Sequence, residues 1–309
     1  MAVEQLIKKM YIGVDLGGTK TESIIIDKDG NEIERLRKDT PKNYNGTIDI
    51  ICDLVNYLEK KFEKNCKIGI GTPGALSNET NCIKGGNSTW LNGMPLKKDI
   101  ELRLNRKIYL ENDANCFALS EAYDGAGSSE EIVFGVILGT GVGGGLVINK
   151  KIINGYNNIA GEWGHNQMSL GSNDKWNRHD CYCGKKGCIE TYLSGTGFSK
   201  HFHEQYNIDL DAKIIQKNAN EGDEKSLEFI YQYIDYLARG LSQVINLVDP
   251  GVIVLGGGVS NMKQIYDNIN SKLQKYVFSD TVNTKVLKNK FGDSSGVRGA
   301  ASLARPKEF

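Results

Sequence analysis

Several features typical of membrane-spanning, exported or disordered chains are missing from this sequence of 309 residues. No run of about 18 apolar residues occurs, and the opening segment MAVEQLIKKM lacks the apolar centre of a secretory signal. Proline is scarce, with 5 residues, while 39% of the residues are hydrophobic, which is typical of a globular chain that buries a core. We therefore expect a cytoplasmic protein with one large domain or two ordinary ones.

An excess of charge of either sign is missing as well. Lys and Arg together number 38, and Asp and Glu together also number 38. A chain that binds nucleic acid or an acidic membrane surface through its overall charge carries a surplus of positive residues. We therefore expect no nucleic-acid partner and no membrane partner.

The cysteines do not suit a disulfide framework, because there are seven of them and thiols stay reduced in the cytoplasm. Four are scattered and are interpreted as packing residues, namely Cys52, Cys66, Cys82 and Cys116. The other three, Cys181, Cys183 and Cys188, are clustered. A cluster of this kind indicates metal ligands, a redox group or buried thiols.

Glycine is abundant, with 36 residues, and it gathers in loops between predicted strands. An apolar run at 11–16 enters the glycine turn at 17–20 and a second run follows at 22–26, which predicts a β-hairpin. A like hairpin is predicted where the apolar run 132–138 enters the loop 139–144. Two such hairpins predict two related halves that face each other across a cleft.

The remaining pattern predicts an alternation of helices and strands. Apolar residues recur with a helical period over 48–62 and over 230–245. Short apolar runs predict strands at 67–70, 107–110 and 252–255. Asp113 follows the second of these strands, where a helix begins, and open α/β sheets usually bind ligands at such points. No Ser-rich or Pro-rich linker occurs, so we expect the domain boundary near residue 120 to be a hinge.

The glycine loops do not match the two commonest nucleotide-binding motifs. Residues 139–144 fit Gly-x-Gly-x-x-Gly, but strand-like sequence follows them where a dinucleotide site needs a helix. The Walker pattern is absent, because Lys20 follows Thr19 and not a glycine. What remains is an acid, Asp15, before a turn whose backbone N–H groups can hold phosphate oxygens, with a plain β-turn as the alternative.

Nine segments together resemble the ROK sugar kinases. They are GVDLGGTKTE (13–22), GTPG (71–74), NSTWLNG (87–93), ENDANC (111–116), LGTGVGGG (138–145), AGEWGHN (160–166), CYCGKKGCIET (181–191), VDPGVIVLGGGVSN (248–261) and GDSSGVRGAA (292–301). The resemblance spans nearly the whole chain. It implies an α/β, hexokinase/actin-like (ribonuclease H-like) fold of two domains with a cleft between them. We expect a small domain at 1–118, with the C-terminal segment 296–309 packing back on it, and a large domain at 119–295.

The same resemblance assigns the catalytic and sugar-binding residues. Asp113 is expected to be the catalytic base, and the alternative is a helix cap. The expected sugar-binding residues are Gly74, Asn87, Asn112, Asp113, Glu162, His165 and Glu190. For Asn87 the alternative is a turn residue, and for Glu190 a solvated helix residue. Trp90 is either a sugar-stacking platform or, more commonly for an isolated tryptophan, a core anchor.

The resemblance also assigns ATP contacts to the glycine loops. The residues expected to hold the phosphates are Gly17, Gly18, Thr19, Lys20, Gly139, Thr140, Gly141, Gly143 and Gly144. Those expected under the adenosine are Gly256, Gly257 and Gly258. Asp15 is expected to hold Mg²⁺ through water. For Lys20 the alternative is an ordinary surface lysine.

The three clustered cysteines need a fourth ligand to form a closed zinc site. His165 would complete a Cys3His set that matches structural zinc, and His179 competes because it lies closer in the sequence. The family resemblance favours His165, so Zn²⁺ is expected on Cys181, Cys183, Cys188 and His165. The zinc is expected to fix the loop that carries the sugar-binding residues.

The expected function is that of an ATP-dependent hexose kinase. Within the family the segments look most like bacterial fructokinases of the manno(fructo)kinase type, which implies fructose 6-phosphate as product and mannose or glucose as secondary substrates. N-acetylglucosamine kinase and glucokinase are the alternatives, because N-acetylglucosamine kinases share ENDANC and LGTGVGGG. A sugar-responsive ROK regulator is the alternative of another class, but few residues precede the first hairpin where its DNA-binding module would lie. A homodimer is a common expectation for the family.

Overall fold

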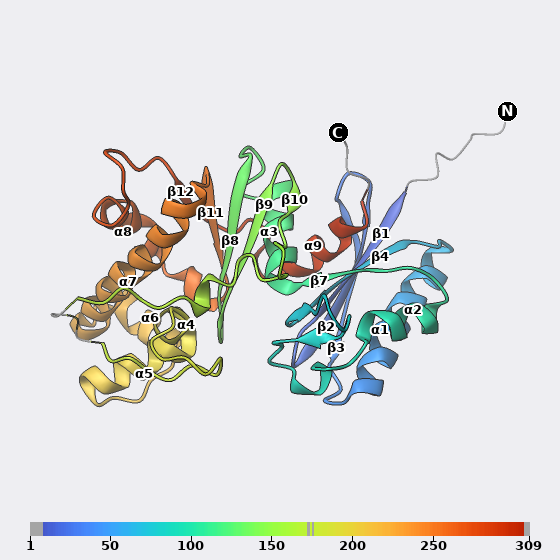
Figure 1. The fold of residues 1–309 in the computed structure, drawn as a ribbon, viewed down its shortest axis with the longest axis horizontal. Helices are drawn as coiled ribbons and strands as arrows, with labels where there is room; N and C mark the ends of the chain where they lie inside the picture. The colour runs from blue at the N-terminus through green and yellow to red at the C-terminus, as the bar shows by residue number, and fades with distance from the viewer. Residues whose placement is uncertain (1–8, 172–173, 175, 306–309) are drawn as a thin grey trace. The chain divides into compact units, whose positions relative to one another are not determined.

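The computed structural model describes residues 9–171, 174 and 176–305, which form two compact units (Figure 1). The first unit contains the chain up to Asp124, residues 154–159 and the segment from Ser294 onward. The second unit contains residues 125–153 and 160–293. Residues 1–8 and 306–309, which the sequence assigns to the small domain, lie outside the described residues.

The first unit is built around a mixed sheet of five strands. In the order β3-β2-β1-β4-β7, they are β3 (Glu32–Asp39), β2 (Lys20–Asp27), β1 (Met10–Leu16), β4 (Lys67–Thr72) and β7 (Tyr109–Asn112). β1 pairs antiparallel with β2, which confirms the first predicted hairpin, and β2 pairs antiparallel with β3. β1, β4 and β7 run parallel, so their carboxyl ends share one edge of the sheet. A small ladder of β5 (Ala75–Leu76) and β6 (Ile83–Lys84) follows β4.

One face of this sheet is covered by α1 (Tyr44–Phe62) and α2 (Leu96–Leu104), with the short helix η1 (Thr89–Leu91) beside them. The helix predicted over 48–62 is confirmed and begins one turn earlier, because the Asn43 side chain accepts a hydrogen bond from the Gly46 N–H as its N-cap. Its apolar stripe, which includes Ile51, Val55 and Leu58, is fully buried in the core.

The other face is covered by α9 (Ser295–Leu303), which also packs along α3 (Asp113–Tyr123) (Figure 1). The backbones approach so closely that only glycine fits at the contacts. A Cβ at Gly69 of β4 would lie 1.8 Å from the Ala300 carbonyl oxygen, and one at Gly299 of α9 would lie 1.7 Å from the Cys116 carbonyl oxygen. This packing ties the end of the described chain to the strands near its beginning.

The second unit repeats the sheet arrangement of the first. In the order β10-β9-β8-β11-β12, its strands are β10 (Lys151–Ile152), β9 (Val142–Ile148), β8 (Ile132–Leu138), β11 (Val252–Gly256) and β12 (Lys285–Lys288). β8 and β9 form the second predicted hairpin, while β8, β11 and β12 run parallel. The directions of all four strand pairs match those of the first sheet. The prediction of two related halves is therefore confirmed.

Helices cover the second sheet and supply most of its core. They are α4 (Glu190–Leu193), α5 (Gly195–Tyr206), α6 (Ala212–Asn220), α7 (Glu224–Val248) and α8 (Lys263–Leu273), with η2 (Trp163–His165), η3 (Gly258–Asn261) and η4 (Gly292–Ser294) in the connections. α7 ends at Val248 with Asp249 as its C-cap, as predicted from the Asp249-Pro250 pair.

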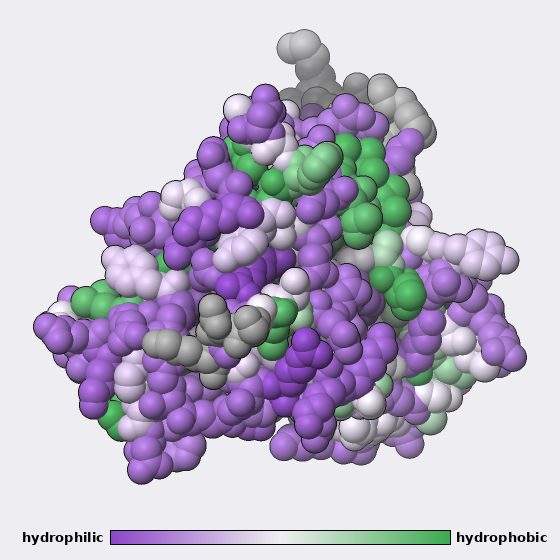
Figure 2. All heavy atoms as spheres, turned by 60° about the vertical axis from the view of Figure 1, so that its left-hand side comes forward, coloured by the Kyte–Doolittle hydropathy of each residue, from purple (hydrophilic) through white to green (hydrophobic). Residues whose placement is uncertain are grey.

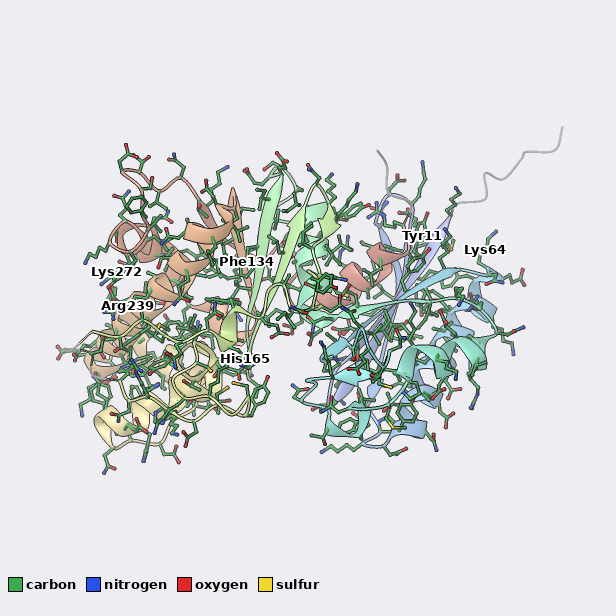
Figure 3. The ribbon with its side chains drawn as sticks, viewed as in Figure 1. Tyr11, Lys64, Phe134, His165, Arg239 and Lys272 are labelled. Atoms are coloured by element: carbon green, nitrogen blue, oxygen red, sulfur yellow. The ribbon has the colours of Figure 1, made fainter. Side chains whose placement is uncertain are left out.

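The Asp235 carboxylate of α7 is shared by three donors, of which Lys272 joins it to α8 and Arg239 belongs to α7 itself. Arg239 of α7 and Lys272 of α8, both labelled in Figure 3, contact Asp235 at 3.0 and 3.4 Å. Tyr276 donates its hydroxyl hydrogen to the same carboxylate at 2.8 Å. Shared use of one partly buried carboxylate by three donors favours a single helix register.

The surface agrees with the composition. In Figure 2 the visible face is mostly hydrophilic, interrupted by smaller groups of hydrophobic residues. Among the residues that the structure describes, every helix is either too short or too polar to cross a lipid bilayer.

We expect Gly69→Ala to lower the thermal unfolding midpoint, because the new methyl group would collide with the α9 backbone rather than with a movable side chain. Overpacking of this kind costs about 1–3 kcal/mol or more. Calorimetry of the variant checks this, with Gly171→Ala as the matched control, since its nearest neighbour would lie at an ordinary 3.7 Å. Equal midpoints for the two variants would contradict the close packing of α9.

Candidate active site

Acidic residues gather at the edge of the first sheet where β1, β4 and β7 end. The strand register places Asp15 of β1 beside Gly71 of β4, and Gly71 beside Glu111 of β7. Asp113 follows two residues later, as the first residue of α3. Parallel strands that end together are where α/β sheets bind ligands, so this edge is the first half of the candidate site.

The residue pair Asn112–Asp113 marks the start of α3. Asn112 is the N-cap, since its Oδ1 accepts hydrogen bonds from the N–H groups of Ala114 and Asn115 at 2.9 and 3.3 Å. The Asp113 carboxylate also accepts from the Ala114 N–H, at 2.8 Å. A helix cap was the alternative role for Asp113. That cap is supplied mainly by Asn112. The Asn112 Nδ2 donates to the Gly74 carbonyl oxygen at 3.1 Å, which brings together two of the predicted sugar-binding residues.

Glu111 is a positioning residue that the sequence did not reveal. Its Oε1 accepts from the Asn112 N–H at 2.8 Å and from Asn115 Nδ2 at 3.0 Å. Its Oε2 accepts from Nδ2 of Asn154 at 2.8 Å. One carboxylate therefore holds the turn before Asp113 and also fixes the segment that begins at residue 154. Only the fold brings Asn154 to this turn, so no local pattern could have found the contact.

Asp15 is held in an unusual electrostatic environment. Burial raises its pKa to about 7, and the negative charges of Asp113 and Glu22 act in the same direction. The first turn of α9 lies against it, since a Cβ on Gly296 would be 2.6 Å from Asp15 Oδ2. Crowded carboxylates with a raised pKa are typical of sites that bind a cation or transfer a proton.

The first glycine turn is closed by its own backbone and by one residue from β3's end. The Gly17 N–H donates to the Lys20 carbonyl oxygen at 3.0 Å. Thr40 donates its hydroxyl hydrogen to the Gly17 carbonyl oxygen at 2.8 Å and its N–H to the Thr19 carbonyl oxygen at 2.9 Å. The ammonium group of Lys20 pairs with exposed Asp39. This pair agrees with the surface-lysine alternative considered for Lys20. Gly18, in the same turn, is half-buried.

Two further predicted residues in the first unit behave differently from each other. Asn87 is exposed in the loop before η1. Trp90 packs partly buried against the core and donates its Nε1 hydrogen to Thr47 Oγ1 at 3.1 Å. The core-anchor interpretation of Trp90 therefore fits the structure better than a sugar-stacking platform.

The second glycine hairpin is bound to the start of α5. The Gly195 N–H donates to the Gly139 carbonyl oxygen at 2.7 Å, and Thr196 donates its hydroxyl hydrogen to the Thr140 carbonyl oxygen at 3.0 Å. On the other side of the loop, the Val142 N–H donates to Glu190 Oε2 at 2.9 Å. The remaining loop glycines, Gly141, Gly143 and Gly144, are half-buried. The alternative interpretation of Glu190 was a solvated helix residue. Its carboxylate is instead tied to the hairpin.

A pocket of about 380 Å³ opens beside this hairpin. Its size lies within the usual range for small-ligand sites. It is lined by Leu138, Gly139, Thr140, Gly195, Thr196, Ser199, Asp211, Ala212, Lys213, Gln216, Gly258, Val259 and Met262. Of the loop predicted to lie under adenosine, Gly258 lines the pocket, while Gly256 and Gly257 are not among its lining residues. Gly257 has a φ of 84°, and a Cβ there would be 2.5 Å from the Leu138 carbonyl oxygen, so glycine is required.

The cysteine cluster gathers around His165. The ligand atoms of His165, Cys181, Cys183 and Cys188 all lie within 4.8 Å of one another. The distance from His165 Nδ1 to Cys181 Sγ is 3.6 Å, and that from Cys183 Sγ to Cys188 Sγ is also 3.6 Å. Zinc–sulfur bonds of about 2.3 Å give tetrahedral edges of about 3.8 Å, so the donor set fits a closed zinc site. His179, the competing ligand, faces elsewhere.

His165 connects this cluster to the other predicted sugar-binding residues of the second unit (Figure 3). Its second ring nitrogen, Nε2, is 3.1 Å from the Tyr182 hydroxyl and 3.9 Å from Glu162 Oε2. Tyr182 is exposed, and its ring packs edge-on against the imidazole at 5.2 Å. Cys181 Sγ lies 3.9 Å from Glu190 Oε1. Tyr182 was not predicted, because a single tyrosine between two cysteines carries no signal of its own.

The sequence of this chain matches a known protein family over nearly its whole length. A model of the ROK family matches residues 11–307. The chain is 39% identical to the N-acetyl-D-glucosamine kinase of Histophilus somni (strain 129Pt) over 300 residues, which cover 95% of this chain and 98% of that protein. The chain belongs to the ROK family.

Solved structures of ROK proteins share its fold. The ROK hexokinase from Thermus thermophilus superposes with a TM-score of 0.84 at 27% identity, over 96% of this chain and 97% of that chain. The ROK glucokinase from Streptomyces griseus, solved with glucose and AMPPNP, gives a TM-score of 0.79 at 28% identity, over 96% and 99%. The predicted family of sugar kinases and the predicted hexokinase/actin-like α/β fold are therefore confirmed. The relatives named here are not fructokinases.

We expect Asp15→Asn to raise the thermal midpoint of this ROK protein, and to do so more at pH 8 than at pH 5. In the folded state Asp15 keeps its proton up to about pH 7, whereas an ordinary aspartic acid loses it near 3.8. Its contribution to stability therefore falls as the pH rises between these values, and the amide removes that loss. Calorimetry at the two pH values checks this, with exposed Asp280→Asn as control. A gain that does not depend on pH would show that burial of the Asp15 charge is not its cause.

Proposed function

We propose that this ROK protein transfers the γ-phosphoryl group of ATP to the 6-hydroxyl of N-acetyl-D-glucosamine. The observation that carries the choice of sugar is the 39% identity, over nearly the whole length of both chains, to a protein named N-acetyl-D-glucosamine kinase. Fructose, the first expectation from the sequence, has no comparable support. Glucose is the nearest competitor, because a glucose-bound ROK glucokinase shares the fold at 28% identity.

In the proposed reaction Asp113 receives the proton of the sugar hydroxyl. The hydroxyl oxygen forms a bond to the γ-phosphorus, the bond from that phosphorus to the bridging oxygen breaks, and ADP leaves. In a loose phosphoryl-transfer transition state the proton leaves late, so Asp113 orients the hydroxyl as much as it deprotonates it. Glu111 fixes the start of α3 through hydrogen bonds, and the nearby carboxylate of Asp15 sets the charge environment of Asp113.

ATP is proposed to bind through the pocket and the two glycine hairpins. The pocket beside Gly258 offers an apolar floor for a purine, with Lys213, Gln216 and Ser199 as polar partners for the base or the ribose. The turns at 17–20 and 139–144 present backbone N–H groups to phosphate oxygens. Mg²⁺ would neutralise the charge that develops on the phosphates, and Asp15 is the residue proposed to hold it through water.

The sugar is proposed to contact Gly74, Asn87, Asn112 and Asp113 from the first unit, and Glu162, His165 and Glu190 from the second. Carboxylates accept hydrogen bonds from hydroxyl groups, and an imidazole whose Nδ1 holds zinc can donate its Nε2–H to a hydroxyl oxygen. The Tyr182 hydroxyl occupies the Nε2 side of His165. A sugar hydroxyl that reaches this nitrogen therefore takes the place of the tyrosine hydroxyl.

Zinc on the Cys3His cluster is proposed to be structural. The cluster holds the loop that carries Glu162 and His165 and, through Cys181, lies next to Glu190. A closed set of four protein ligands leaves no position for substrate. The ion would therefore orient side chains without touching the reacting phosphate.

A coupled assay of ADP release tests the sugar and the base together. With N-acetylglucosamine, glucose, mannose and fructose as acceptors, we expect the highest kcat/KM for N-acetylglucosamine. Asp113→Asn should lower kcat by about 10²–10⁴-fold, because the loss of a general base has that size. Asp280→Asn, on the surface of the second unit, is the matched control and should leave kcat unchanged.

The outcomes separate the parts of the proposal. A higher kcat/KM for glucose or fructose would overturn the choice of sugar while leaving the kinase intact. Full activity of Asp113→Asn would overturn the assignment of the base. Sugar binding without any phosphorylation would favour a sensor over a kinase.

Removal of one zinc ligand tests the structural ion. We expect Cys188→Ser to hold one zinc fewer per chain than the wild type and to unfold at a lower temperature, because Cys188 is fully buried within the cluster. Cys82→Ser, outside the cluster, should change neither value. Elemental analysis and calorimetry of the three proteins provide the measurement. Equal zinc content in all three would contradict a zinc site on these cysteines.

A further inference from the structure

A second group of metal-binding side chains lies close to the cysteine cluster. His179, two residues before Cys181, meets two residues of α5, namely His201 and Glu204. The ligand atoms of these three residues lie within 4.8 Å of one another. We propose that His179, His201 and Glu204 form a second site, distinct from the Cys3His cluster, for a divalent transition-metal ion such as Zn²⁺.

The distances suit one ion shared by three ligands. His179 Nε2 is 3.1 Å from Glu204 Oε2, and His201 Nδ1 is 3.8 Å from the same oxygen. Zinc bonds of about 2.0–2.1 Å to nitrogen and oxygen give tetrahedral edges of about 3.3 Å. The Glu204 side chain is 29% exposed, so its carboxylate is able to shift toward a shared ion. Two imidazoles and one carboxylate are a common zinc-binding set with an open fourth position.

His201 supplies the second, independent observation. Its side chain is 1% exposed, and its Nε2 has no hydrogen-bond partner among the residues that the structure describes. Its Nδ1, at 3.8 Å from the carboxylate, is too far away for a direct hydrogen bond. One ring nitrogen of His201, Nε2, is therefore buried at a cost in free energy, and Nδ1 is spaced from the Glu204 carboxylate for a shared ion rather than for a direct hydrogen bond.

The surroundings hold the ring in place for such a role. The His201 imidazole stacks on Trp176 at 4.4 Å and on Tyr192 at 5.1 Å, with interplanar angles of 15° and 16°. A buried imidazole among aromatic rings stays neutral, which is the form that binds metals. Asn177 Nδ2 donates to Glu204 Oε2 at 3.3 Å and so orients the carboxylate. Side chains supported in this way form a rigid ligand set.

A simple ion pair between His179 and Glu204 is the competing explanation. It accounts for the distance of 3.1 Å between them but makes no use of the His201 Nδ1, which lies 3.8 Å from the same carboxylate. A metal ion uses all three residues and would fasten the segment that leads into the cysteine cluster to α5. This proposal does not depend on which sugar the protein phosphorylates.

Zinc content at equilibrium tests the site in the full chain. After dialysis against micromolar zinc, we expect Glu204→Gln and His179→Asn each to hold one zinc fewer per chain than the wild type. His203→Asn, which removes an exposed histidine of the same helix outside the group, should match the wild type. Because only differences are compared, the zinc on the cysteines does not affect the result. His179→Asn could lower the zinc content by disturbing the nearby cysteines. In that case the zinc content of Glu204→Gln decides whether the second site exists.

Cobalt added to protein that keeps zinc on the cysteine cluster, but has been freed of more weakly held zinc by a mild chelator, gives a second readout. Cobalt bound by nitrogen and oxygen should show visible ligand-field bands without the near-ultraviolet thiolate charge-transfer band, and these bands should be lost in Glu204→Gln. Equal zinc content in the wild type and both variants would overturn the proposal and leave an ion pair only. A thiolate charge-transfer band would also overturn it, since the cobalt would then be in the cysteine cluster.

Discussion

The close contact between α9 and the first sheet is the constraint on which the first half of the site depends. Glycines at positions 69 and 299 allow backbones to approach where any side chain would collide. The same helix touches β1, which carries Asp15, β4, which leads into the turn with Gly74, and α3, which begins with Asp113. Ser295 reinforces the contact by donating to buried Glu121 at 2.7 Å. The spacing of the acidic groups is therefore set by backbone packing beneath them.

In the second unit the Glu190 carboxylate positions the residues of the site, as the packing of α9 does in the first unit. Glu190 accepts from the Val142 N–H of the glycine hairpin and lies beside Cys181 of the metal-binding cluster. Glu190 begins α4, which leads into α5, and the start of α5 binds Gly139 and Thr140, so one short stretch of chain connects hairpin, pocket and cysteines. The hairpin, the pocket and the cysteines are therefore connected by a small number of hydrogen bonds and residues.

The sequence predicted what local patterns can encode. Both hairpins, the strand before Asp113 and the amphipathic helices followed from glycine turns and apolar periodicity. It did not predict Thr40 closing the first turn, Asn154 on Glu111, or Tyr182 on His165, because each contact joins residues that only the fold brings together. It also could not separate fructose from N-acetylglucosamine, since motifs that bind phosphate and position Asp113 are common to kinases for several sugars.

The return of α9 to the first sheet also bears on how the chain folds during synthesis. The apolar face formed by Tyr11, Ile24 and Ile26 is covered by Val297, Ala301 and Ala304, which lie almost a full chain length later. A ribosome therefore releases this face uncovered and completes it only when the last helix emerges. The whole second unit lies between these partners in the sequence and can complete its own core first. The apolar face of the first sheet thus stays uncovered while the second unit is synthesised, and chaperones can act on it during that interval.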